Sequence, residues 1–265
     1  MDLDDHQSKN GKPPAIVARE ALSIAGEKLE TAFRLAEPKI SFKGRRDVVT
    51  DIDFAVEKSI KEFLLREFPD YGFVGEELGA VNFDSPFRWV LDPIDGTANF
   101  AKGIPNVATT LALTYLGEPI IGGTLDPLRD HLFFAEKGKG FTFNGKNMSF
   151  APAEQFDRAT IGLDMGPNEE LVQKSLEIAL GILPVHRIRI MGSAALGLAY
   201  VAAGWFDLYM HLELKPWDVA AGLLFIKESK ADLVCVGPEF ETANLQTDKF
   251  LAGNRVLVNQ CKFWQ

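Results

Sequence analysis

The chain has 265 residues, of which 46% are hydrophobic and 25% charged, so it is long and apolar enough to bury a large core. Its net charge of −9 argues against nonspecific nucleic-acid binding, and no stretch approaches the ~18–20 apolar residues of a membrane helix. Nothing at its start resembles a signal peptide, and its two cysteines have neither disulfide nor zinc-site spacing. We therefore expect a cytoplasmic protein with no nucleic-acid or membrane partner.

Residues 1–14 are polar and lack apolar periodicity, so they are predicted to form a disordered tail. Residues 15–265 are predicted to fold as a single unit with two halves, because no Ser-, Gly- or Pro-rich linker interrupts them. The first half, 15–151, is predicted to be an α+β segment with two helices followed by antiparallel strands. The second half, 152–265, is predicted to alternate helices with strands, and its expected helices are 168–182, 192–203 and 216–229.

The most informative segment covers residues 88–100. A short apolar run predicts a buried strand that ends at Asp92 and Asp95, whose charges need compensation if they are buried. Mg²⁺ can supply that compensation because it prefers hard oxygen ligands. Gly96 and Thr97 then begin a helical turn, whose free N–H groups can bind a phosphate. The segment therefore predicts metal-assisted hydrolysis of a phosphate ester.

Further acidic segments lie at the edges of other apolar elements. Glu76 and Glu77 follow a short strand, and Asp218 lies in the first turn of a predicted helix. Thr50 and Asp53 resemble a capping box at the start of an amphipathic helix. Taken singly, each segment is adequately explained by its local structure: a solvated surface is the better explanation for the two glutamates, and a helix cap is sufficient for the others. Their joint occurrence favours one metal site.

Two motifs make the chain resemble the inositol monophosphatase family, part of the lithium-sensitive, metal-dependent sugar phosphatase superfamily. They are Trp-Val-Leu-Asp-Pro-Ile-Asp-Gly-Thr-Ala-Asn-Phe at 89–100 and Pro-Trp-Asp-Val-Ala-Ala-Gly at 216–222, in the expected order. The resemblance extends over about residues 16–258 and is that of a bacterial or archaeal-type member. It implies an α+β fold, the layered αβαβα sandwich of the sugar phosphatases, and a homodimer.

The resemblance also implies the activity of a Mg²⁺-dependent phosphomonoesterase, a hydrolase similar to inositol-1-phosphatase. Its substrate would be a small phosphorylated polyol or sugar, hydrolysed by direct attack of a metal-activated water. Two to three Mg²⁺ ions are implied, with Mn²⁺ as a possible substitute and with Ca²⁺ or Li⁺ as inhibitors.

The metal ligands that the resemblance implies are all present in the chain. One ion would be held by Glu76, Asp92 and the backbone carbonyl of Ile94. A second would be held by Asp92, Asp95 and Asp218, and a third, weaker ion would lie near Glu76.

The catalytic residues that the resemblance implies are Thr97, Asp53, Glu76 and Asp47. Thr97 and Asp53 would orient the attacking water, with Asp47 close by. The N–H groups of Gly96 and Thr97 would bind the phosphate.

The remaining implied residues surround this centre. Gly192, Ser193 and Ala194 would contact substrate hydroxyls, although their small side chains are explained equally well by close helix packing. Glu77 would position ligands without contacting an ion, and Lys43, in the loop before Asp47, would reach a metal-bound water.

The substrate stays open because the chain departs from the animal members. They carry a glutamate that bonds an inositol hydroxyl where this chain has His211. The cationic loop 41–47 is also one residue shorter, and its arginines either meet a second phosphate or are only solvated. The alternative activities are therefore those of a fructose-1,6-bisphosphatase, a histidinol phosphatase or an NADP or nucleotide phosphatase. A non-catalytic regulatory binding protein is the alternative of another class, and retention of the acidic residues argues against it.

Overall fold

A computed structural model describes residues 6–35, 38–42, 48–150, 153, 155–236 and 249–260. The predicted loop residues Lys43 and Asp47 lie outside these ranges. None of the helices in the described part of the chain has the length and apolarity needed to cross a bilayer.

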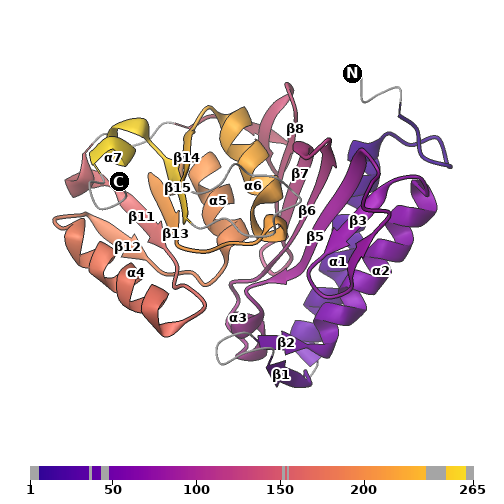
Figure 1. The fold of residues 1–265 in the computed structure, drawn as a ribbon, viewed down its shortest axis with the longest axis horizontal. Helices are drawn as coiled ribbons and strands as arrows, with labels where there is room; N and C mark the ends of the chain where they lie inside the picture. The colour runs from indigo at the N-terminus through magenta and orange to yellow at the C-terminus, as the bar shows by residue number, and fades with distance from the viewer. Residues whose placement is uncertain are drawn as a thin grey trace.

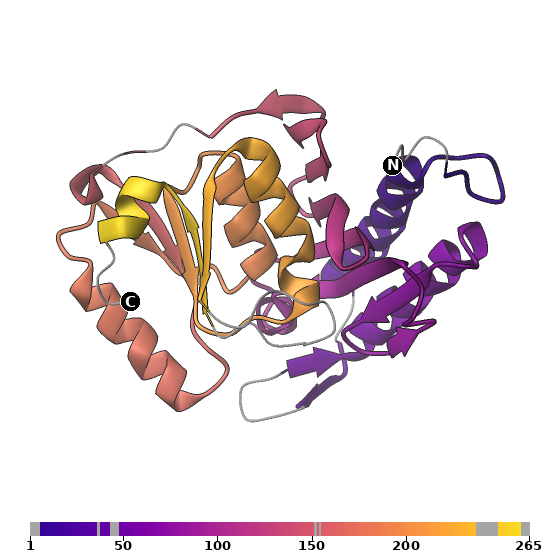
Figure 2. The same cartoon turned by 45° about the horizontal axis from the view of Figure 1, so that its top comes forward.

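Helices and sheets alternate in five layers (Figure 1). The long helices α1 (Pro14–Leu35) and α2 (Asp51–Glu67) cover one face of an eight-stranded sheet. Helices α5 (Ala194–Ala202) and α6 (Pro216–Ser229) fill the space between this sheet and a five-stranded sheet. Figure 2 shows α4 (Glu169–Gly181) and α7 (Arg255–Gln260) on the outer side of the five-stranded sheet. The predicted layered α+β sandwich is confirmed, and so are the three helices predicted in the second half.

The eight-stranded sheet has the order β10-β9-β8-β7-β6-β5-β3-β4, and only the β3–β5 pair is parallel. Its strands are β3 (Gly72–Gly75), β4 (Gly79–Val81), β5 (Phe87–Asp95), β6 (Ala108–Tyr115), β7 (Glu118–Asp126), β8 (His131–Glu136), β9 (Gly140–Phe143) and β10 (Lys146–Met148). The register between β5 and β6 shifts between Asp92 and Asp95. Proline lacks an N–H group to donate to the neighbouring strand, and Pro93 lies at this shift. The irregularity therefore lies between the two carboxylates, each of which still pairs with a residue of β6.

The five-stranded sheet has the order β12-β11-β13-β15-β14 and is mixed. Its strands are β11 (Thr160–Leu163), β12 (Arg187–Arg189), β13 (Leu208–His211), β14 (Asp232–Val236) and β15 (Lys249–Gly253). The pairs of β11 are parallel and those of β15 antiparallel. A short hairpin of β1 (Ile40–Phe42) and β2 (Val48–Thr50) leads into α2, α3 (Thr97–Ala101) follows β5, and a 3₁₀ turn, η2 (Phe156–Arg158), precedes β11.

The segment 6–13, which the sequence assigns to a disordered tail, is held against the end of α2. The backbone N–H of Lys9 donates to the Glu67 carbonyl at 2.9 Å, and the Asn10 side chain donates to the Glu67 carboxylate at 2.7 Å. His6 Nδ1 lies 3.2 Å from the hydroxyl of Tyr71. These partners are distant in sequence, so composition alone gave no signal of them.

Candidate active site

Four acidic side chains from three segments lie close enough to repel one another. Asp92, which is 2% exposed, has a pKa well above its ordinary value because it is buried and because Glu76, Asp95 and Asp218 add negative charge. Burial likewise raises the pKa of Asp218, and repulsion from Asp95 and Glu76 raises it further. Buried carboxylates that repel one another need a cation or protons to be stable. Their hard oxygen atoms suit Mg²⁺ among the common divalent ions.

Backbone N–H groups orient two of these carboxylates. Asp92 Oδ1 accepts a 2.9 Å hydrogen bond from the N–H of Ile94, and Asp218 Oδ2 accepts one of 2.7 Å from that of Lys215. The second bond is possible because Lys215 is the N-cap of α6 and Asp218 lies three residues further on. A carboxylate has two oxygen atoms, so each residue retains one oxygen for another ligand.

Asp95 is oriented instead by the start of α5. Its carboxylate accepts hydrogen bonds from the Ser193 hydroxyl, from the N–H of Ala195 at 2.9 Å and from the N–H of Ala194 at 3.2 Å. Burial raises the pKa of Asp95 to about 6, although these three donors lower it. Among the described residues, no three His, Cys, Asp or Glu side chains are arranged to hold one ion. The metal-ligand set therefore stays a prediction.

The predicted catalytic pair is brought together between α2 and α3. Thr97 Oγ1 lies 3.2 Å from Asp53 Oδ1 and 2.8 Å from the carbonyl oxygen of Ile94. Asp53 is 1% exposed, and its other oxygen accepts the N–H of Thr50 at 2.8 Å, which confirms the predicted capping interaction. Burial raises the pKa of Asp53, while the contacts with Thr50 lower it.

Gly96 lies between two chain segments that leave no room for a side chain. Its φ is +91°, and a Cβ atom would lie 2.7 Å from the carbonyl oxygen of Asn106 and 3.0 Å from that of Gly192. Glycine satisfies both the left-handed backbone and the close approach. The turn that follows Asp95 is thereby packed against both halves of the chain.

Glu57 is a site residue that the sequence analysis missed. It is fully buried on α2, and its carboxylate accepts the N–H groups of Glu77 and Leu78, each at 2.8 Å. A Cβ atom on Gly75 would lie 2.0 Å from Glu57 Oε1, so the carboxylate fits only against a glycine. Glu57 therefore holds the turn that carries Glu76. A carboxylate on the apolar face of a predicted amphipathic helix was the available signal.

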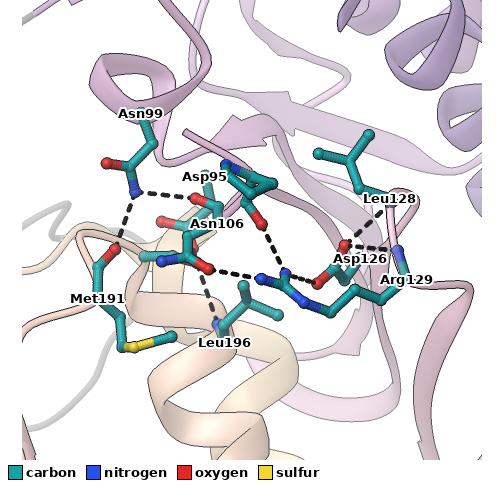
Figure 3. A network of polar contacts seen from close by, with 10 residues as sticks. Asp95, Asn99, Asn106, Asp126, Leu128, Arg129, Met191 and Leu196 are labelled. Carbon is teal, nitrogen blue, oxygen red and sulfur yellow. Dashed lines mark hydrogen bonds and ion pairs between the residues drawn. The ribbon is translucent and has the colours of Figure 1, made fainter. Parts of the chain in front are cut away.

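Asn99 and Asp164 were also missed, and both hold the segment before α5. The Asn99 side chain donates to the carbonyl oxygen atoms of Met191 at 2.8 Å and Asn106 at 2.9 Å (Figure 3). Asp164 follows β11, is 4% exposed, and accepts the N–H groups of Met191 and Gly192. Asp164 has no local pattern that identifies it, because its partners lie far along the chain.

The loop that carries Asn106 is held by an ion pair between the exposed Arg129 and the buried Asp126 (Figure 3). Arg129 Nη1 lies 2.5 Å from Asp126 Oδ2, and Asp126 has no exposed side-chain surface. The same guanidinium donates to the carbonyl of Pro105 at 2.6 Å and to Asn106 Oδ1 at 2.9 Å. Asn106 therefore has a fixed position above Gly96.

The predicted substrate-side residues are engaged within the protein. The polar groups of Gly192, Ser193 and Ala194 bond to Asp164, Asn99 and Asp95. His211 is 8% exposed at the end of β13, and its Nδ1 accepts the N–H of Glu213 at 3.1 Å. Burial lowers the pKa of His211 to about 4, so the imidazole is neutral near pH 7 and carries its proton on Nε2.

Known proteins resemble this chain over nearly its whole length. Residues 12–261 match the model of the inositol monophosphatase family. The chain belongs to this family. It is 35% identical over 247 residues to the fructose-1,6-bisphosphatase/inositol-1-monophosphatase of Aquifex aeolicus, with 91% of this chain and 90% of that protein covered. It is 37% identical over 244 residues to the inositol-1-monophosphatase of Caulobacter vibrioides, with 90% and 95% covered.

The fold of this inositol monophosphatase family member is also that of solved relatives. It superposes on the extragenic suppressor protein suhB of Bartonella henselae with a TM-score of 0.86 at 31% identity, covering 93% of this chain and 95% of that one. The chain is accordingly an enzyme, a phosphatase of the phosphoric monoester hydrolase class, and its family is generally metal-dependent.

Proposed function

We propose that this enzyme is a Mg²⁺-dependent phosphomonoesterase that acts on a small phosphorylated polyol or sugar. The buried cluster of mutually repelling carboxylates supports this proposal, because such a cluster beside a hydroxyl–carboxylate pair would be stabilised by divalent cations. Glu76, Asp92 and the carbonyl of Ile94 would hold one ion. Asp92, Asp95 and Asp218 would hold the other. When bound, Mg²⁺ would neutralise charge on the phosphate and lower the pKa of a water molecule.

Thr97 and Asp53 would orient the attacking water. The Thr97 hydroxyl has one proton, which it can donate to Asp53 or to the carbonyl of Ile94. Its oxygen lone pairs are then directed to accept a proton from water. Because Asp53 is anchored by Thr50 at the start of α2, the pair is fixed before substrate binds. The N–H groups of Gly96 and Thr97 would contact the phosphate at the start of α3.

His211 argues for weaker discrimination among substrate hydroxyls than a glutamate at this position would give. A glutamate accepts hydrogen bonds from two hydroxyls, whereas the neutral His211 ring offers one N–H donor, since its Nδ1 is already occupied. A site that lacks the matching group loses much of its discrimination for a hydroxyl. The Aquifex relative is named for activity on both fructose 1,6-bisphosphate and inositol phosphate. We propose a comparably broad sugar phosphate range for this enzyme.

The test is phosphate release with and without Mg²⁺ from inositol 1-phosphate, fructose 1,6-bisphosphate, histidinol phosphate, NADP and adenosine 3′,5′-bisphosphate. We expect Mg²⁺-dependent release that Ca²⁺ and Li⁺ inhibit. Thr97→Val should lower kcat by about 10²-fold or more, the usual contribution of a positioned proton acceptor. Thr114→Val is the matched control, because this buried hydroxyl bonds the carbonyl of Arg88 at the far end of β5. No Mg²⁺-dependent release from any substrate would refute the proposal.

A further inference from the structure

The peptide segment 191–192 is held from both halves of the enzyme. On one side, Asp164 Oδ1 accepts the N–H groups of Met191 at 2.8 Å and Gly192 at 2.7 Å. On the other, Asn99 Nδ2 donates to the carbonyl oxygen atoms of the same two residues, at 2.8 and 3.2 Å. Asp164 belongs to the five-stranded half, and Asn99 lies in α3, directly after β5. These four hydrogen bonds therefore fix the orientation of the backbone at residues 191 and 192.

The segment continues directly into the turn that binds Asp95. Ser193 is the N-cap of α5, accepts the N–H of Leu196 at 3.4 Å, and donates its own hydroxyl to Asp95. The N–H groups of Ala194 and Ala195 bond to the same carboxylate. The position of Gly192 thus determines where the three donors to Asp95 lie.

Asp164 is itself held firmly enough to transmit this position. Its second oxygen accepts the hydroxyl of Tyr209 at 2.9 Å, and the Tyr209 side chain is fully buried. The ring of Tyr209 packs so closely on α5 that a Cβ atom on Gly197 would lie 2.3 Å from it. Asp164, the segment it holds and α5 therefore form one packed unit. Neither the sequence motifs nor the proposed catalytic residues account for this buried carboxylate.

We propose that Asp164 is a positioning residue for the metal site. It holds Met191 and Gly192 so that the first turn of α5 presents its donors to Asp95, and this fixes the orientation of the Asp95 carboxylate. The inference rests on the proposed function, in which Asp95 is a Mg²⁺ ligand. Groups that orient metal ligands typically affect metal affinity or activity by about 10–100-fold.

The experiment measures Mg²⁺ binding to the resting full-length enzyme by titration calorimetry, with circular dichroism as the check of folding. Asp164→Ala should weaken Mg²⁺ binding by about 10–100-fold. Asp164→Asn should restore it to near the wild-type value, because the amide oxygen can still accept both N–H groups. The matched control is Asp207→Ala, since the Asp207 carboxylate accepts the N–H groups of Ala153 and Thr160 in the same half without touching the segment. It should bind Mg²⁺ as the wild type does.

A second variant keeps the test decisive if Asp164→Ala does not fold. Asn99→Ala releases the carbonyl side of the segment from a side chain that is only partly buried, and it should also weaken Mg²⁺ binding. Wild-type Mg²⁺ affinity in either folded variant would overturn the positioning role. If wild-type enzyme releases no phosphate with Mg²⁺, the proposed function itself fails. Wild-type release combined with unchanged affinity in the variants refutes only the role of Asp164.

Discussion

Acidification should destabilise the enzyme through His211, because its burial holds the imidazole neutral. The ring is 8% exposed, and its folded-state pKa is lowered to about 4. In the unfolded chain the pKa returns to about 6.5. A histidine with a lowered folded pKa stabilises the fold fully above pH 6.5, and this contribution is lost as the pH falls from 6.5 toward 4.

The size of the effect follows from the two pKa values. At pH 5 nearly all unfolded chains carry the proton on this histidine, whereas about one folded molecule in ten does. The difference in proton binding lowers the free energy of unfolding by about 2 kcal/mol between pH 7.5 and pH 5. Below pH 4 the loss levels off at about 3 kcal/mol.

The assay is urea unfolding across pH 7.5 to 5 in Mg²⁺-free buffer, compared between the wild type and His211→Asn. Asparagine can place its oxygen near the position of Nδ1 and so keep the hydrogen bond from Glu213, but it does not titrate. The buried acids titrate equally in both proteins, so they cancel in the difference. We expect the stability advantage of the wild type to shrink by about 2 kcal/mol over this range.

A difference between the two proteins that stays constant with pH would refute the reasoning. An independent check is the nitrogen NMR spectrum of the imidazole rings. The His211 ring should remain neutral with its proton on Nε2 down to about pH 5, because its folded pKa is about 4. A ring that titrates near pH 6.5 would show that His211 is not desolvated.

Three further predictions concern the acidic site and its supports. Glu57→Gln should leave one of the two N–H groups of Glu77 and Leu78 without an acceptor, and so lower the free energy of unfolding by about 1–3 kcal/mol. An unchanged midpoint of urea unfolding would contradict this. Gly96→Ala should abolish most phosphate release, because its Cβ atom would collide with neighbouring carbonyl oxygen atoms. Gly103→Ala, at φ +69° with nothing within 4 Å, should retain phosphate release. Equal activities of the two variants would show that crowding at Gly96 does not affect catalysis. Asp92→Asn should raise the thermal unfolding midpoint measured without Mg²⁺, because it removes a charge that its acidic neighbours repel. It should also abolish Mg²⁺-dependent phosphate release. A lower midpoint than that of the wild type would contradict the repulsion.

The sequence was most informative where structure depends on neighbouring residues. The apolar run before Asp92 is a strand, and Thr50 and Asp53 cap a helix as their spacing predicts. Pro216 begins the helix that carries Asp218. Strand alternation, capping and turn formation each involve residues within a few positions, so a single sequence can reveal them. The same patterns, together with two family motifs, were sufficient to predict the layered fold.

The residues that hold the site in place could not be predicted from local sequence patterns. Glu57 bonds to residues 20 and 21 positions away, and Asp164 to residues 27 and 28 positions away. Asn99 reaches across 92 residues to Met191. Each side chain is an ordinary polar residue in its own segment. Its role exists only when the layers are stacked.

By itself, the sequence determined the family, the layered architecture and the acids that gather at the end of β5. The tertiary structure decided how those acids are held: Asp95 turned toward α5, His211 buried as a neutral ring, and Gly96 enclosed by two distant carbonyl groups. The physical reason is that periodicity and turn chemistry specify local backbone geometry. Burial, hydrogen-bond partners and the resulting pKa values depend on which distant segments fill the space around a side chain.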